Sequence, residues 1–263
     1  IEYRLVADSE ESDLELSDFS SEKSDIVVEN KPCLKGSVLH IDGDKDYLKM
    51  CLDKYKEFNI TVYGYYMEES EIKDKIIPLL EKHRPDLLVI TGHDAMKKNS
   101  DRKNINSYLH TKDFVEAIRK ARLYQDDKDS LIIFAGACQS YYELLLASGA
   151  NFASSPSRKN IHALDPVFIV SQIANASIKN YVDLEKIVAK TSNKHLGIGG
   201  IDTRGVARKI YPTRNILTFR ETDTISGQEG LDVQKKTDGS VNIIGEVATD
   251  PVASWMIQSA QVA

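Results

Sequence analysis

The chain has 263 residues, of which 41% are hydrophobic and 28% charged, a composition typical of a soluble globular protein. Its formal net charge of −6 argues against a general nucleic-acid binder. No apolar stretch approaches the ~20 residues that a membrane helix needs. Three cysteines are too few for a disulfide framework, and their spacing fits no zinc motif. A reducing compartment and at least one free thiol are the simpler interpretation.

Three parts are expected along the chain. Residues 1–34 are acidic and rich in serine, with few apolar side chains to bury, so we expect a largely flexible segment. Residues 35–212 carry the periodic patterns of a folded domain. Residues 213–263 are polar and punctuated by turn signals, and we expect an appendage of unknown role with a hairpin at 241–248.

Strands and helices alternate in the middle part. Strands are predicted over 37–41, 60–66, 87–91, 131–135 and 152–155, and helices over 46–57, 71–83, 111–124, 138–148, 166–175 and 184–191. We expect Thr111 to cap its helix, Pro78 to kink or divide 71–83, and 197–200 to form a loop. Alternation with short connections indicates an α/β fold, in which a parallel sheet is covered by helices on both faces.

Two of the predicted strands end beside reactive residues. The apolar run 87–91 is followed by Gly92 and His93, and the run 131–135 leads through a glycine to Cys138. Active groups of parallel α/β sheets gather beyond the carboxyl ends of the strands. Cys138 follows His93 by 45 positions (138 − 93), which leaves room for one crossover helix between neighbouring strands.

A thiol and an imidazole at one sheet edge predict nucleophilic catalysis. His93 can serve as general base and acid, and Cys138, predicted to open helix 138–148, would have its pKa lowered by the helix N-terminus. The backbone N–H groups of Asp94 and Cys138 are candidates for an oxyanion hole. No metal or organic cofactor is implied, because a thiolate and backbone donors suffice. Singly, each side chain is more often a buried cysteine or a solvated histidine; it is the pairing that favours catalysis.

The two strand-end motifs carry a resemblance to known peptidases. An apolar strand followed by histidine, and another followed by Ala-Cys, resemble the caspase–gingipain–clostripain group. More closely, the chain resembles the YabG family of sporulation peptidases, over roughly residues 1–212. The matching stretches are 84–94 and 134–140, with 5–9, 154–156 and 199–205 in addition.

This resemblance implies both a fold and an activity. Residues 35–212 would form a caspase-like catalytic domain, a sheet sandwiched between helices, with the dyad His93 and Cys138. The activity would be an arginine-directed cysteine endopeptidase that processes spore-coat and cortex-associated proteins, and itself. Such a protein would act in the mother-cell cytoplasm or the developing coat, with protein substrates that contain arginine sites and no nucleic-acid or membrane partner. The oligomeric state stays open.

An arginine preference requires a carboxylate in the substrate pocket. Asp44 and Asp165 lie in loops at the expected sheet edge and are the first candidates, although each could instead be a turn or helix-capping aspartate. Arg158, Arg214 and Arg220 look exposed and are candidate self-cleavage sites.

Where most relatives outside YabG have glycine after the histidine, this chain has Asp94. Its carboxylate could orient His93 or meet a basic substrate, and the sequence does not decide between them. The stretch after Pro212 resembles nothing in the family.

Two other functions compete with the peptidase. Residues 38–44 resemble the first strand and acidic pair of a response-regulator receiver, but His93 follows the strand where a receiver needs its aspartate, and 154–156 offer no lysine. A non-catalytic scaffold that binds the spore coat is the other alternative, and the sequence alone does not exclude it.

Overall fold

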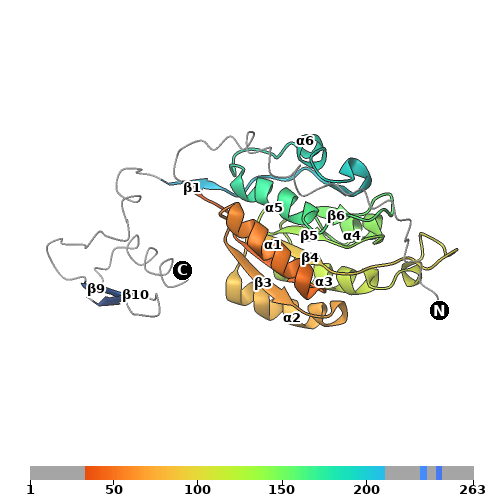
Figure 1. The fold of residues 1–263 in the computed structure, drawn as a ribbon, viewed down its shortest axis with the longest axis horizontal. Helices are drawn as coiled ribbons and strands as arrows, with labels where there is room; N and C mark the ends of the chain where they lie inside the picture. Colours follow the sequence, from red (N-terminus) through yellow and green to blue (C-terminus); the bar gives the residue numbers. More distant parts are fainter. Residues whose placement is uncertain (1–32, 211–231, 236–240, 245–263) are drawn as a thin grey trace. The chain divides into compact units, whose positions relative to one another are not determined.

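A computed structural model describes residues 33–210, 232–235 and 241–244 (Figure 1). The chain divides into two compact units, one ending at Ile210 and the other beginning at Tyr211, and each is described by itself. The expectations for residues 1–32, and for Arg214 and Arg220, lie outside the described residues. The predicted boundaries after residues 34 and 212 stay predictions.

The first unit is built on a six-stranded sheet in the order β3–β2–β4–β5–β6–β7. The strands are β2 (Val38–Asp42), β3 (Val62–Tyr66), β4 (Leu87–Thr91), β5 (Ile132–Ala135), β6 (Phe152–Ser154) and β7 (Ile198–Gly200). The first five are parallel to their neighbours, and β7 runs antiparallel to β6. The expected α/β class is confirmed, and the sheet has one antiparallel edge strand in addition.

The prediction of a loop over 197–200 was wrong. It rested on the glycines of this stretch, because glycine is usually depleted in strands. Here the missing side chains allow close packing. A Cβ on Gly199 would clash with the Tyr142 hydroxyl, and one on Gly200 would lie 2.6 Å from the Asn151 carbonyl oxygen. The glycines therefore let β7 pack against the sheet edge.

Helices cover both faces of the sheet (Figure 1). One layer holds α1 (Lys45–Glu57), α5 (Asp165–Asn175) and α6 (Leu184–Val188); the other holds α2 (Glu69–His83), α3 (Thr111–Tyr124) and α4 (Tyr142–Ala147). Short 3₁₀ turns lie at η1 (Ile105–Ser107) and η2 (Lys194–Leu196), and β1 (Cys33–Leu34) pairs antiparallel with β8 (Arg208–Lys209). The expected two-layered helical covering is thus confirmed.

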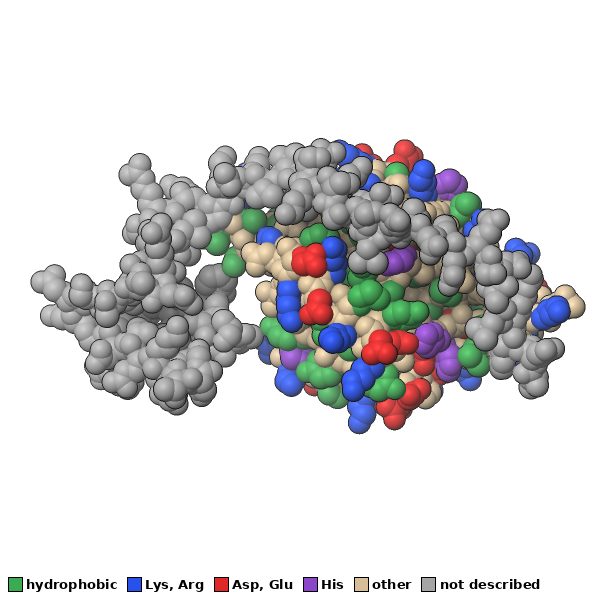
Figure 2. All heavy atoms as spheres, viewed as in Figure 1, with side chains coloured by type: hydrophobic (Ala, Val, Ile, Leu, Met, Phe, Trp, Pro, Cys, Tyr) green, Lys and Arg blue, Asp and Glu red, His purple; other side chains and the backbone are tan. Residues whose placement is uncertain are grey.

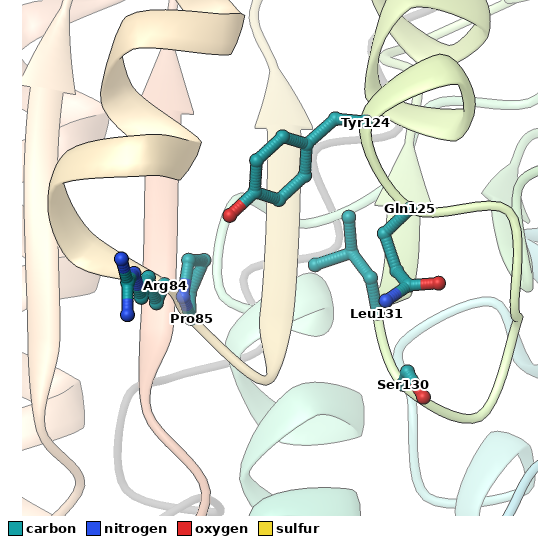
Figure 3. Close-up of a pocket in the computed structure, with 6 residues that line it drawn as sticks. All are labelled: Arg84, Pro85, Tyr124, Gln125, Ser130 and Leu131. Carbon is teal, nitrogen blue, oxygen red and sulfur yellow. The ribbon is translucent and has the colours of Figure 1, made fainter.

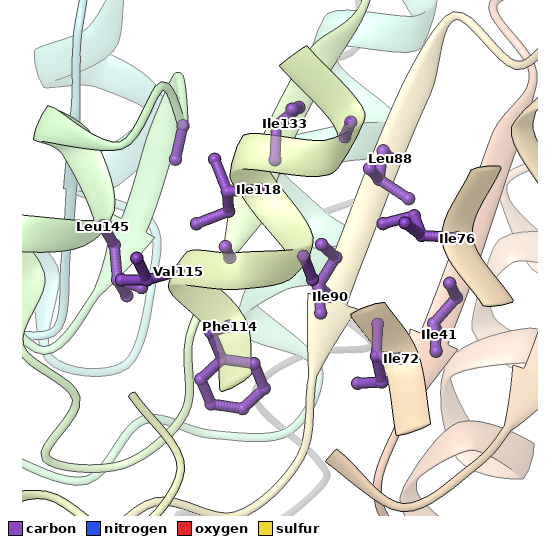
Figure 4. Close-up of a cluster of buried hydrophobic side chains, with 14 of the residues drawn as sticks. Ile41, Ile72, Ile76, Leu88, Ile90, Phe114, Val115, Ile118, Ile133 and Leu145 are labelled. Carbon is purple, nitrogen blue, oxygen red and sulfur yellow. The ribbon is translucent and has the colours of Figure 1, made fainter. Parts of the chain in front are cut away.

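Strand β4 contributes side chains to both hydrophobic cores, because successive side chains of a strand point to opposite faces of the sheet. Leu88 and Ile90 pack with the α2 and α3 side chains, among them Ile72, Ile76, Phe114 and Ile118 (Figure 4). Leu87 and Val89 pack on the other face with Tyr55 of α1 and with α5. A strand buried on both faces explains why its sequence is a continuous apolar run.

Three helix predictions need correction. Helix α2 starts at Glu69 and is not divided at Pro78; a kink at that residue stays a prediction. Thr111 is the first residue of α3 rather than its cap. Helix α4 begins only at Tyr142, not at Cys138. Positive φ angles at Gly136 (108°) and Gln139 (60°) interrupt any helical path before it.

The second unit contains a hairpin of β9 (Asp232–Lys235) and β10 (Val241–Ile244), which pair antiparallel. The hairpin expected at 241–248 therefore has its partner strand upstream.

Acidic and basic side chains are interspersed on the coloured part of the face in Figure 2, as on an ordinary protein surface. Among the described helices, none combines the length and apolarity needed to cross a membrane.

Replacing Leu88 with alanine is expected to lower the free energy of unfolding by about 2–5 kcal/mol, because Leu88 is fully buried in the core. Leu123→Ala is the matched control, since this α3 side chain is 87% exposed, and we expect a change within about 0.5 kcal/mol. Urea denaturation measures both. Equal losses would contradict the burial of Leu88 in the core and the exposure of Leu123.

Candidate active site

The pairing of β4 with β5 sets the position of the two reactive residues. Every registered pair, from Leu87 with Ile132 to Ile90 with Ala135, is offset by 45 residues (132 − 87). The ladder extends one step further, since the Gly136 N–H donates to the Ile90 carbonyl at 3.0 Å. Cys138 has the same offset from His93 (138 − 93 = 45), so each lies three residues beyond the last registered pair, Ile90 with Ala135.

His93 is held at its backbone and at its ring. Its N–H donates to Glu69 Oε1 at 2.6 Å, and its Nε2 lies 3.1 Å from Asp44 Oδ2. The buried Glu69 carboxylate occupies the space that a Cβ on Gly43 or Gly92 would need, which explains both glycines. The imidazole itself remains 59% exposed and can meet a substrate.

Asp44 divides its two oxygens between a helix and the histidine. Oδ1 accepts the N–H groups of Asp46 and Tyr47 and so caps α1. The Tyr47 N–H is the largest cause that lowers the pKa of the Asp44 carboxyl, followed by the His93 contact. Asp44 is therefore a helix cap that also presents a carboxylate to the imidazole.

Cys138 lies in the tight turn between β5 and α4, and two other segments hold that turn, one through serine hydroxyls and the other through a backbone N–H. Ser155 Oγ accepts the Gln139 N–H at 3.0 Å, and Ser154 Oγ donates to the Ala137 carbonyl at 2.9 Å. The Met96 N–H donates to Gln139 Oε1 at 3.2 Å. The cysteine is thus carried on a braced turn and not on a free loop.

The expectation that a helix N-terminus lowers the pKa of Cys138 was wrong, because α4 starts four residues later. Burial instead raises the pKa of the Cys138 thiol, a rise to which the nearby Asp94 charge adds. The thiol lies 3.9 Å from the Ile161 carbonyl. A raised pKa leaves less of this thiol as thiolate, so its use as a nucleophile would require a base.

Residues 22–212 match the family described as YabG peptidase U57. The chain belongs to the YabG peptidase family. It is also 49% identical over 183 residues to the sporulation-specific protease YabG of Bacillus subtilis (strain 168). That match covers 69% of this chain and 63% of the relative. His93 and Cys138 both lie within the segment that matches the YabG family.

Asp165, the other candidate for the substrate pocket, is fully buried at the start of α5. One of its oxygens accepts the His162 N–H at 3.1 Å, and the other accepts the N–H and the hydroxyl of Ser192, each at 3.0 Å. These contacts tie two loops together. They favour a structural role over contact with a substrate arginine.

Arg158 is not the exposed site that the sequence suggested, since only 8% of its side chain is accessible. Its guanidinium packs over the rings of Tyr108 and Tyr141 and donates to Glu143 at 2.6 Å. A side chain held in this way is not presented for cleavage, because these contacts would first have to break.

Sequence reasoning missed Glu69, the group that fixes the His93 backbone. It stands in the first turn of α2, where an acidic residue is ordinary, so no periodicity or spacing singles it out. Its role emerges only when α2 packs beside the glycines that end β2 and β4.

A hollow of about 170 Å³ lies at the amino-terminal ends of β4 and β5, at the other end of these strands from His93 and Cys138 (Figure 3). Pro85, Leu131 and Tyr124 are among its lining residues, and none belongs to the Cys138 turn. Within the described part of the chain, no three His, Cys, Asp or Glu side chains gather in a way that could hold a metal ion.

Alkylation of Cys138 by iodoacetamide should rise at a higher pH in the folded chain than in the same chain unfolded in urea. Burial raises the pKa of this thiol, so at any intermediate pH the folded chain holds less thiolate. Peptide mapping separates Cys138 from Cys33 and Cys51. A folded-state midpoint below that of the unfolded chain would contradict this description.

Proposed function

We propose that this chain is a cysteine endopeptidase of sporulation, with Cys138 as the nucleophile and His93 as the general base and acid. The observation that carries the proposal is the 45-residue register between β4 and β5, which brings both residues to one edge of the sheet. Membership of the YabG peptidase family supports the same reaction class.

In this mechanism His93 takes the proton of the Cys138 thiol, and the thiolate attacks the carbonyl carbon of the scissile bond. Asp44 stabilises the resulting imidazolium from Nε2, the nitrogen that it contacts. His93 then gives its proton to the leaving amine as the carbon–nitrogen bond breaks. Water, deprotonated by His93, hydrolyses the thioester and regenerates the thiol.

The negative oxygen of the tetrahedral intermediate needs donors. We assign this role to the backbone N–H groups of Asp94 and Cys138; neither donates to another residue within 33–210. Preorganised donors of this kind typically contribute about 10²–10³-fold to kcat.

Arginine preference and spore-coat or cortex substrates are part of the proposal and rest on the resemblance to YabG. Asp44 is the more accessible of the two candidate carboxylates, with 26% of its side chain exposed, but it already serves His93 and α1. Asp165 has no exposed surface. We therefore treat Asp44 as the partner of the histidine and leave the pocket carboxylate to experiment. The proposed place of action is the mother-cell cytoplasm or the developing coat.

A fluorogenic peptide with arginine at the cleaved position should be hydrolysed faster than its lysine and alanine versions. Cys138→Ala should abolish the release, and His93→Ala should lower it by at least about 10²-fold, since proton transfer is lost. Asp44→Asn keeps a helix-capping side chain but loses the charge beside the imidazole, so we expect a lower kcat with a folded protein. Initial rates and circular dichroism measure these effects.

Release that survives in Cys138→Ala would refute the thiol mechanism. No release from any peptide by the wild-type chain would favour the non-catalytic scaffold. Equal rates for arginine and alanine would refute the arginine preference alone. Self-cleavage, proposed from the resemblance, predicts that the intact mass of the wild-type chain falls with time while that of Cys138→Ala stays constant.

A further inference from the structure

The Asp94 carboxylate joins three segments of the site. It is buried, and it accepts the N–H groups of Ala95 and His110, each at 2.9 Å. It also accepts the hydroxyl protons of Thr111 and Ser140, the latter at 2.9 Å. These donors come from the loop after β4, from the start of α3 and from the cysteine turn. The carboxylate therefore points into the protein, away from both roles that the sequence left open.

The hydroxyls of Ser140 and Thr111 also bind the backbone at the two ends of the cysteine turn. Ser140 Oγ accepts the Ala137 N–H at 2.9 Å, and Thr111 Oγ1 accepts the Tyr141 N–H at 3.0 Å. A hydroxyl has one proton and two lone pairs, so each can donate to Asp94 and accept a backbone N–H at once. The turn is thus attached to one carboxylate oxygen at its first and last residues.

We propose that Asp94 is a positioning residue, which holds the turn that carries Cys138 against the loop that carries His93. Because Asp94 follows His93 directly, its hydrogen bonds fix the cysteine turn relative to the histidine backbone. This inference rests on the proposed peptidase function and adds the part that sets the distance between nucleophile and base.

Only a carboxylate meets the requirements of this position. Its Oδ2 receives two hydroxyl protons, while Oδ1 receives two backbone N–H groups. An asparagine would place an NH₂ group where Oδ2 stands, and the two hydroxyl protons would lose their acceptor. Burial raises the pKa of the Asp94 carboxyl, and the four donors act against that rise. The four donors thus offset part of the cost of burying this carboxylate.

The test removes one hydroxyl without changing shape or charge. Thr111→Val should lower kcat by at least about tenfold with little change in KM, because displacement of reacting groups by a fraction of an ångström slows the chemical step. Thr111→Ser retains the hydroxyl and should keep most of the wild-type kcat. Ser140→Ala removes the other hydroxyl and should resemble Thr111→Val. Thr191→Val, which removes a buried hydroxyl distant from the turn in the chain, is the control and should leave kcat unchanged.

Backbone hydrogen exchange provides a readout that does not depend on activity. Faster exchange is expected at Tyr141 in Thr111→Val and at Ala137 in Ser140→Ala, with β3 unchanged. Faster local exchange with an unchanged kcat would overturn the positioning role, as would equal losses of kcat in the valine and serine variants. A wild-type chain with no Cys138-dependent hydrolysis would instead refute the proposed function, and the two failures are therefore distinguishable.

Discussion

The main-chain hydrogen bonds between β4 and β5 are the constraint on which the site depends. Each strand is buried on both faces, so a slip of one residue would turn every side chain of β5 to the wrong core. The hydrophobic pattern therefore fixes the register of β4 and β5. The register in turn fixes how far beyond the paired strands His93 and Cys138 lie. The geometry of the proposed catalytic pair thus follows from core packing.

Beyond the ends of the strands, hydrogen bonds to buried polar groups, rather than hydrophobic packing, hold the loops in place. Glu69 holds the His93 backbone, and Asp94 connects the following loop to the Cys138 turn. Both carboxylates are buried, and the hydrogen bonds that they accept offset the cost of burying them. Burial also raises the pKa of the Cys138 thiol, so the proposed mechanism relies on the placement of the base more than on a preformed thiolate.

The sequence predicted the features that are set locally or by hydrophobic periodicity. The five parallel strands, most helices and the spacing of His93 and Cys138 belong to this class. The path of the cysteine turn does not, because a positive φ at Gln139 and contacts with residues such as Thr111 and Ser155 determine it. The burial of Arg158 likewise depends on Tyr108, which is 50 positions away in the chain.

The most direct test of the central claim is to locate the residue that a substrate-like inhibitor modifies. A peptidyl chloromethyl ketone, carrying the residue preferred in the fluorogenic-peptide test, should inactivate the proposed peptidase as a single adduct forms, and peptide mapping should place that adduct on Cys138. His93→Ala should slow the reaction without moving the adduct. Complete inactivation with Cys138 unmodified would contradict the account, because the nucleophile would then be another side chain.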